Sequence, residues 1–191
     1  MGGQNKSVSA RERILEAADR LFYRDGIRAV GIDTVIAEAG VAKMTLYSHF
    51  KSKDELIAAY LRRRDERFRT WFATTVEQHA AKTGDWLAGL FVALGEWFVT
   101  PDFRGCAFIN ATAELPDPHH PGRKAIAEHK QLFTDFVVEV LRKAHVKNPN
   151  QVVGAIGLLI NGAILESACE GSPAAAETAH AAARKLLGRE V

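Results

Sequence analysis

Cysteine is scarce in this 191-residue sequence. Its two cysteines, Cys106 and Cys169, lie far apart and have no CxxC spacing. This pattern argues against a cysteine-based zinc module or a disulfide framework and fits a reducing cytoplasm. The sequence also lacks a run of about 18 uncharged apolar residues, so we expect no membrane partner. The polar segment Met1–Ala10 has no apolar core and is therefore not expected to be a secretory signal.

Sequence motifs of common enzyme classes are missing as well. The chain has no glycine-rich phosphate loop, no H-E-x-x-H pair and no G-x-S-x-G turn. We therefore predict no enzyme activity, no catalytic residues, no metal site and no cofactor. Sustained strand-like alternation is also missing, whereas apolar residues recur at helical spacing in every clearly periodic segment. The predicted fold class is all-α.

Charge is distributed unevenly along the chain. Residues 1–69 carry 14 Lys and Arg against 10 Asp and Glu, whereas residues 70–191 carry 11 against 13. A basic N-terminal end is compatible with a polyanionic partner, but this imbalance also fits an ordinary solvated surface. Charge alone therefore does not assign a function.

The N-terminal third of the chain contains four predicted helices. The first covers Arg13–Tyr23, and a second, with Asp33 as its N-cap, ends at Gly40. A third covers residues 42–49, and a fourth begins after Ser52 and continues into the late seventies. Further helices are predicted over residues 86–99, 105–115, 123–144, 150–170 and 173–187, with a proline-rich loop before the pair of long helices.

The second and third helices form a predicted helix-turn-helix. Their apolar residues fall at spacings that make one shared core: Val35, Ile36, Ala39, Val41, Leu46 and Phe50. The remaining side chains form a short polar surface on a helix narrow enough for the DNA major groove. Including flanking phosphate contacts, the predicted DNA-binding residues are Thr34, Ala42, Lys43, Met44, Thr45, Tyr47, His49 and Lys53.

Residues 11–56 resemble the N-terminal domain of the TetR family of bacterial repressors. Arg11–Phe22 follows the pattern R-x-x-I-L-x-A-A-x-x-L-F, and Ala39–Leu56 reads A-G-V-A-K-M-T-L-Y-S-H-F-K-S-K-D-E-L. The chain has Ala42 where the family usually has serine, which removes one hydroxyl from a phosphate contact or helix cap. The resemblance implies a helix-turn-helix domain over residues 8–68 and a helical-bundle domain for effector binding and dimerisation over residues 69–191.

The function implied by this resemblance is that of a ligand-responsive homodimeric repressor. It would bind a double-stranded DNA operator and release it when a small molecule binds the C-terminal domain. Such a protein acts in the cytoplasm, in association with the nucleoid. The alternative is a helical ligand-binding or interaction module with little affinity for DNA.

The two long helices near residues 123–144 and 150–170 are the predicted dimer interface. Gly154, Gly157 and Gly162 lie along a small-residue side of the second helix, which permits close helix approach. The first helix would supply bulky partners: Phe133, Phe136, Val137, Val140 and Leu141. The alternative is that the two helices pack together inside one chain.

Aromatic residues are dense in the C-terminal domain, which indicates an apolar effector pocket with a few polar groups. Aromatic residues at helical spacing also occur in ordinary cores, and that alternative stays open. The candidate effector-binding residues are Trp71, Trp86, Phe91, Trp97, Phe98, Phe108, Asn110, Glu114, His129 and Asn161.

Two further sites remain open alternatives between chemistry and packing. Cys106 is either a thiol sensor, with Arg104 as its one nearby cation, or a small buried apolar residue. A set of acidic and histidine residues is either a metal site or a solvated loop with helix caps, and the prolines in that segment favour the loop. The set comprises Glu114, Asp117, His119, His120 and His129.

Overall fold

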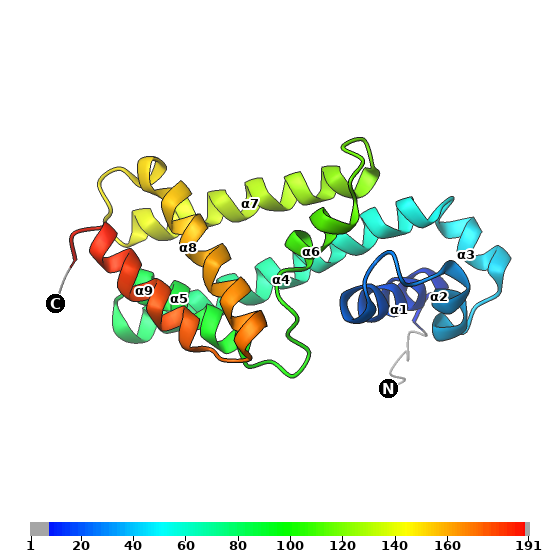
Figure 1. The fold of residues 1–191 in the computed structure, drawn as a ribbon, viewed down its shortest axis with the longest axis horizontal. Helices are drawn as coiled ribbons and strands as arrows, with labels where there is room; N and C mark the ends of the chain where they lie inside the picture. The colour runs from blue at the N-terminus through cyan, green and yellow to red at the C-terminus, as the bar shows by residue number, and fades with distance from the viewer. Residues whose placement is uncertain (1–7, 190–191) are drawn as a thin grey trace, which may run out of the picture. The chain divides into compact units, whose positions relative to one another are not determined.

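The computed structural model describes residues 8–189, so most of the N-terminal segment Met1–Ala10 lies outside the described residues. Every regular element in the described range is an α-helix, which confirms the all-α class. The elements are α1 (Ala10–Asp25), α2 (Ile32–Ala39), α3 (Lys43–His49), α4 (Lys53–Thr83), α5 (Trp86–Phe98), α6 (Ala107–Glu114), α7 (Pro121–Lys143), α8 (Pro149–Glu170) and α9 (Ala174–Leu186) (Figure 1).

The helices form two compact units. The first unit comprises Met1–Arg64 and Ala107–Ile126, and the second comprises Asp65–Cys106 and Ala127–Val191. Consequently α6 belongs to the first unit, although the sequence interpretation treated the domain up to residue 68 as one continuous segment. Both α4 and α7 contribute residues to each unit.

The core of the first unit forms between α1 and the helices that follow it. Ser9 caps α1 by accepting a hydrogen bond from the Glu12 amide (3.2 Å), as its spacing predicts. Phe22 of α1 is 3% exposed and makes an edge-to-face contact with Tyr60 of α4, with ring centroids 5.5 Å apart. The Arg64 guanidinium stacks on the Tyr23 ring and pairs with an acidic residue of α1, which fixes the start of α4 on α1.

The second unit has its own core of aliphatic and aromatic residues. It is built from the second part of α4 together with α5, α7, α8 and α9. At Gly89, α5 approaches α4 so closely that a Cβ atom there would lie 2.9 Å from the carbonyl oxygen of Val76. Only glycine permits this backbone contact.

The α7 residues expected at a dimer interface lie inside the second unit instead. Val137, Val140 and Leu141 are at most 2% exposed and belong to the core that α8 also joins. The prediction that these three residues face a second chain is therefore wrong, because their own chain already buries them. These three positions therefore belong to the core of a single chain, to which α8 also contributes.

Helix α8 has one buried and one exposed apolar side. Ile156 and Ile160 are fully buried, whereas Leu158 is 73% and Leu165 59% exposed. By length and composition alone, Pro149–Glu170 is long and apolar enough to cross a membrane. The inner side of α8 packs in the core with α9, whereas its outer side leaves apolar residues exposed.

Candidate nucleic-acid interface

A tight turn joins α2 to α3 in the first unit. Gly40 has φ 60° and ψ 44°, a left-handed conformation that glycine adopts without a steric penalty. Its amide donates to the carbonyl of Ala37 (3.2 Å), and the Val41 amide donates to that of Ile36 (3.3 Å). These bonds satisfy carbonyls at the end of α2, and the chain turns directly into α3 as the sequence predicts.

The packing of α3 decides which of its side chains face outward. Leu46 of α3 and the next residue after the helix, Phe50, are 0% and 2% exposed, and Val35 of α2 is fully buried. Helix α3 packs against both α1 and α2. The inward side of this seven-residue helix is therefore fixed, and its remaining residues form the opposite side.

Most of the predicted DNA-binding residues lie on this opposite side. Met44 is 78% and Tyr47 40% exposed, and Thr45 is half-buried between them. The other residues on this surface, all exposed, are Thr34, Ala42, Lys43 and His49. The surface thus combines hydrogen-bond donors, a hydroxyl and an apolar side chain on one helix, which suits contact with base edges and phosphates.

Helix α2 begins differently from the prediction. Gly31, not Asp33, occupies the N-cap position, and no side chain caps the helix. Asp33 lies in the first turn instead, where its carboxylate is 3.2 Å from the Lys43 ammonium. Both side chains of this ion pair are exposed. Local spacing could not have indicated this contact, because it depends on how α2 and α3 cross.

Lys53 is half-buried and lies outside α3, at the start of α4. Its ammonium donates a 2.7 Å hydrogen bond to the Ile27 carbonyl and lies 5.9 Å from the centroid of the Phe22 ring. Burial lowers the pKa of Lys53, and the nearby charge of Glu114 offsets part of this effect. The side chain therefore holds the α1–α2 connection, and a phosphate contact would use its remaining donors.

Glu114 also lies at the α1–α2 connection, in the first unit. Its carboxylate accepts a 2.8 Å hydrogen bond from the Arg28 amide and sits against Gly26, where a Cβ would be 3.2 Å away. Gly26 has φ 93°, so a side chain there would also strain the backbone. Two other candidate effector residues, Phe108 and Asn110, belong to the first unit as well. These three are thus separated from the candidates of the second unit.

The candidate effector residues of the second unit do not form one group. Four of them, Trp71, Trp97, Phe98 and His129, join an aromatic cluster that also includes Phe68 and Phe133. The remaining candidates lie elsewhere, since Phe91 stacks on His180, Trp86 lies under the Lys143 ammonium, and Asn161 is half-buried on α8.

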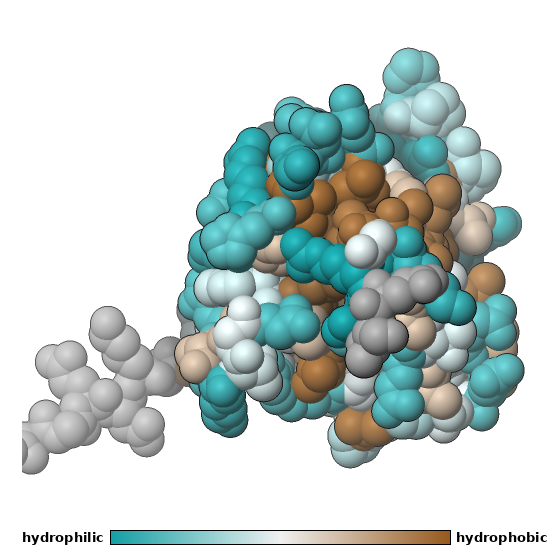
Figure 2. Space-filling model, turned by 90° about the vertical axis from the view of Figure 1, so that its left-hand side faces the viewer, coloured by the Kyte–Doolittle hydropathy of each residue, from teal (hydrophilic) through white to brown (hydrophobic). Residues whose placement is uncertain are grey.

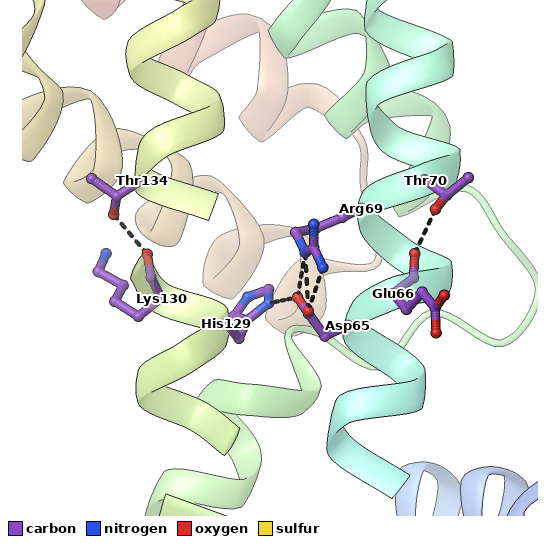
Figure 3. A network of polar contacts seen from close by, with 7 residues as sticks. All are labelled: Asp65, Glu66, Arg69, Thr70, His129, Lys130 and Thr134. Atoms are coloured by element: carbon purple, nitrogen blue, oxygen red, sulfur yellow. Dashed lines mark hydrogen bonds and ion pairs between the residues drawn. The ribbon is translucent and has the colours of Figure 1, made fainter. Parts of the chain in front are cut away.

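A buried polar network joins α4 to α7 beside this aromatic cluster (Figure 3). Asp65 accepts a 2.7 Å hydrogen bond from His129 Nδ1 and three hydrogen bonds of 2.8–3.0 Å from Arg69. Burial raises the pKa of Asp65, but the hydrogen bonds from Arg69 and His129 outweigh it and leave the pKa below its ordinary value. No local sequence pattern indicates the role of Asp65, because its partner His129 lies 64 positions away.

The candidate thiol and metal residues are also separated. Cys106 is half-buried and Cys169 exposed, and neither forms a disulfide. Among residues 8–189, no three His, Cys, Asp or Glu side chains are grouped to hold a metal ion. His120 instead pairs with Asp54 (3.2 Å) in the first unit, while His129 belongs to the second unit.

Comparison with known proteins identifies the family. The model described as "Bacterial regulatory proteins, tetR family" matches residues 14–60. The crystal structure of SCO4454, a TetR-family transcriptional regulator from Streptomyces coelicolor, is 34% identical and covers 95% of this chain and 96% of its own, with a TM-score of 0.81. The chain belongs to the TetR family. It is therefore a DNA-binding transcriptional regulator, and the family match agrees with the helix-turn-helix surface on α3.

Curated relatives of this TetR-family regulator have similar lengths. The HTH-type transcriptional regulator YjdC of Escherichia coli is 25% identical over 93% of both chains. The HTH-type transcriptional regulator LmrA of Bacillus subtilis is 29% identical over 83% of this chain and 86% of its own. The similarity thus extends well beyond the helix-turn-helix into the second unit.

The structural role of Lys53 leads to a first prediction. Lys53→Ala should lower the free energy of unfolding by about 1–2 kcal/mol, because it removes a partly buried, charge-assisted hydrogen bond to Ile27. Lys51→Ala is the matched control, since Lys51 is exposed two residues earlier. Urea unfolding of the full chain measures both, and equal midpoints for the two variants would contradict the role.

The buried His129 leads to a prediction about pH. Burial lowers its pKa, and the hydrogen bond that it donates to Asp65 offsets only part of this effect. Below the ordinary histidine pKa of about 6.5, the unfolded chain takes up a proton that the folded chain resists, so stability should decrease as pH decreases. Asp65 acts in the same direction below about pH 3.9, since its folded pKa is depressed.

Unfolding free energies at pH 7.5 and 5.5 measure the effect of His129. Its contribution to the decrease is bounded by about 1.4 kcal/mol per pH unit. Between pH 7.5 and 5.5, the free energy of unfolding of His129→Gln should decrease less than that of the wild type. The free energy of His119→Gln, at an exposed position, should decrease as much as that of the wild type. An unchanged pH dependence in His129→Gln would show that the histidine titrates alike in the folded and unfolded chains.

Proposed function

We propose that this TetR-family regulator is a homodimeric repressor, acting on the nucleoid in the cytoplasm, that releases its operator when a small molecule binds the second unit. The observation that carries the DNA-binding part is the outer side of α3, where Lys43, Met44 and Tyr47 are exposed beside the half-buried Thr45. A helix of this kind places its N-terminal residues against base edges in the major groove.

The exposed side of α8 supports pairing of two chains. Leu158 and Leu165 lie seven residues apart on one side of the helix, 73% and 59% exposed. On the same side, a Cβ at Gly154 or Gly162 would meet nothing within 4 Å in this chain. Figure 2 shows apolar side chains at the surface of the second unit. Small residues between large apolar ones permit close helix packing, and a two-fold axis would cover both copies at once.

A second copy explains this surface better than a membrane does. One side of α8 is committed to the protein core through Ile156 and Ile160, which are fully buried. A membrane span would expose apolar residues to lipid around much of its circumference. Two DNA-binding units also read two half-sites, about 34–36 Å apart in the usual geometry, which gives selectivity that one short helix does not.

The aromatic cluster of the second unit supports a small-molecule site. The rings of Phe68, Trp97, Phe103 and Phe133 are partly buried rather than sealed in the core. The network around Asp65 supplies polar groups beside them, since His129 bonds to Asp65 and its ring contacts Phe68 and Phe133. Small-molecule sites are mostly apolar with a few placed polar groups, which is the composition found here.

Helix α4 supplies a route from that site to the DNA-binding unit. It runs without a break from Lys53 to Thr83 and contributes to both units. A ligand that shifts its second part would change the separation of the two α3 helices in a dimer. The ligand must bind the shifted state more tightly, and couplings of about 1–3 kcal/mol are typical. Screening aromatic compounds for release of bound DNA tests this step.

The competing function is a helical module with little affinity for DNA. In vitro selection of DNA by the wild-type protein decides between the two, because a module of that kind would enrich no sequence even at low salt. On the selected DNA, the double variant Lys43→Ala/Tyr47→Ala should bind at least about a hundredfold more weakly, because both copies lose their contacts. Binding should also weaken steeply with salt.

The matched control for that measurement is Lys147→Ala, which removes an exposed cation from the second unit. It should bind the selected DNA as the wild type does. Equal losses in the control and the double variant would mean that overall charge, and not the α3 surface, determines binding.

The dimer surface leads to a further prediction. Leu158→Glu should convert the protein into a monomer, because a dimer would bury the two introduced carboxylates in an apolar interface. Leu132→Glu, at a 43% exposed position of α7, is the control and should leave the dimer intact. Analytical ultracentrifugation measures the mass, and circular dichroism checks the fold. A monomeric Leu132→Glu with a dimeric Leu158→Glu would assign the interface to α7.

A further inference from the structure

An acidic side chain lies on the side of the first unit that faces DNA in the proposed function. Asp33, in the first turn of α2, has 83% of its side chain exposed, and its carboxylate oxygen is 3.2 Å from the ammonium of Lys43. Lys43 is the first residue of α3. In helix-turn-helix proteins the N-terminal residues of this helix contact base edges, so the ion pair lies where bases are read.

The fold itself does not require this carboxylate. It caps no helix, since Gly31 is the N-cap of α2 and no side chain bonds to the first amides. An ion pair with both partners exposed contributes little to stability, because water screens it. Its remaining structural role is a general one, because any acid in the first turn of α2 interacts favourably with the helix dipole.

A carboxylate on a DNA-binding surface restricts what DNA it accepts. It is repelled by every phosphate and by the acceptor groups of the bases, and in the major groove its donors are the amino groups of cytosine and adenine. The ammonium of Lys43 has the opposite preference, since it donates to acceptors such as guanine O6 and N7. The pair thus presents an acceptor beside a donor, at a fixed separation.

We propose that Asp33 and Lys43 together read one G·C base pair in each operator half-site. Lys43 Nζ donates to guanine O6 and N7, and the Asp33 carboxylate accepts from the N4 amino group of the paired cytosine. Guanine O6 and cytosine N4 are hydrogen-bonded to each other, so their spacing is about 2.9 Å, close to the 3.2 Å between Asp33 and Lys43. The proposal rests on binding of DNA through α3.

The order of groups in the groove distinguishes G·C from the other base pairs. Across its major-groove edge, G·C presents two acceptors and then a donor, which matches Lys43 followed by Asp33. An A·T pair presents acceptor, donor, acceptor and the thymine methyl, so a carboxylate on the adenine amino group lies beside the thymine O4 and is repelled. The reversed pair, C·G, places the donor under Lys43. One orientation is therefore preferred.

The same ion pair reduces binding to DNA of unrelated sequence. Lys43 is partly neutralised by Asp33 before any DNA arrives, so it adds less attraction to phosphates than an unpaired lysine would. The Asp33 carboxylate itself repels the phosphate backbone of DNA that lies close to it. Asp33 is therefore a specificity-determining residue, which lowers non-specific affinity and favours one base pair.

In vitro selection of DNA with the full-length protein tests this inference. The wild type should enrich sequences with one G·C position per half-site, preferred by at least about tenfold over A·T. Asp33→Asn and Asp33→Ala should retain the rest of the selected site and reduce the G·C preference at this position to the part that Lys43 supplies through guanine. Two variants are needed because asparagine alone can read adenine, which would change the preference rather than relax it.

Glu38→Gln is the matched control for the loss of one negative charge. Glu38 is also on α2, and its carboxylate pairs with Arg20 (2.9 Å) rather than with α3. This variant should select the same sequences as the wild type. Because Asp33 and Glu38 are both exposed, unfolding midpoints of all variants should stay close to that of the wild type.

The possible outcomes separate this inference from the proposed function. If both Asp33 variants bind all sequences more tightly and keep the G·C preference at its wild-type strength, the carboxylate only repels DNA and the base-reading role is wrong. If Glu38→Gln also loses the preference, the effect is one of charge and not of position. If the wild type enriches no sequence at all, DNA binding through α3 fails and this inference fails with it.

Discussion

The burial of Leu46 and Phe50 is the constraint on which the DNA-binding surface depends. Helix α3 has seven residues, and a helix of this length is not stable alone in water, because nucleation costs more than so few hydrogen bonds return. Leu46 within the helix and Phe50 directly after it, 0% and 2% exposed, supply the missing stabilisation. The orientation of Lys43 and Tyr47 is therefore set by apolar packing on the opposite side of the helix.

Helix α4 is held by buried contacts in both units. Within two consecutive residues its contacts change from α1 to α7: Arg64 pairs with Asp19 of α1, and Asp65 accepts from His129 of α7. Both contacts are at least partly buried, so their geometry is more restrictive than that of an exposed pair. A displacement of α7 would thus move Asp65. The adjacent residue of α4, Arg64, is the one that contacts α1 of the DNA-binding unit.

How much of this could be predicted from the sequence depends on the range of the interaction. The Ser9 cap and the Gly40 turn follow from spacing over a few residues, and the resemblance over residues 11–56 predicted the helix-turn-helix. Contacts between distant segments escaped prediction, because no local pattern encodes them. The contact of Glu114 with the Arg28 amide, 86 residues apart, is of this kind, and so is the pair of Asp33 with Lys43.

The α7 and α8 helices illustrate a second reason for incomplete prediction. Both carry apolar residues at helical spacing, and periodicity alone does not say whether a side chain packs within its own chain or against another. Val137 and Leu141 are buried within the chain, whereas Leu158 on α8 is 73% exposed. Only the arrangement of α7, α8 and α9 around one core separates these cases.

The pairing of charges in the first unit links its affinity to the dimer. Residues 1–69 have a surplus of only four positive charges, and several of the cations are already paired with acids of the same unit. The pairs are Arg20–Glu38, Arg24–Asp25, Lys43–Asp33, Arg63–Glu12 and Arg64–Asp19. Non-specific affinity for DNA grows with the number of phosphates neutralised, so one copy of this unit gains little from charge alone. In the proposed dimer, two copies held together by the exposed side of α8 would bind as one ligand with twice the contacts, and α3 would contribute in both half-sites. A weakly charged DNA-binding unit would then depend on the second unit for affinity as well as for the proposed regulation.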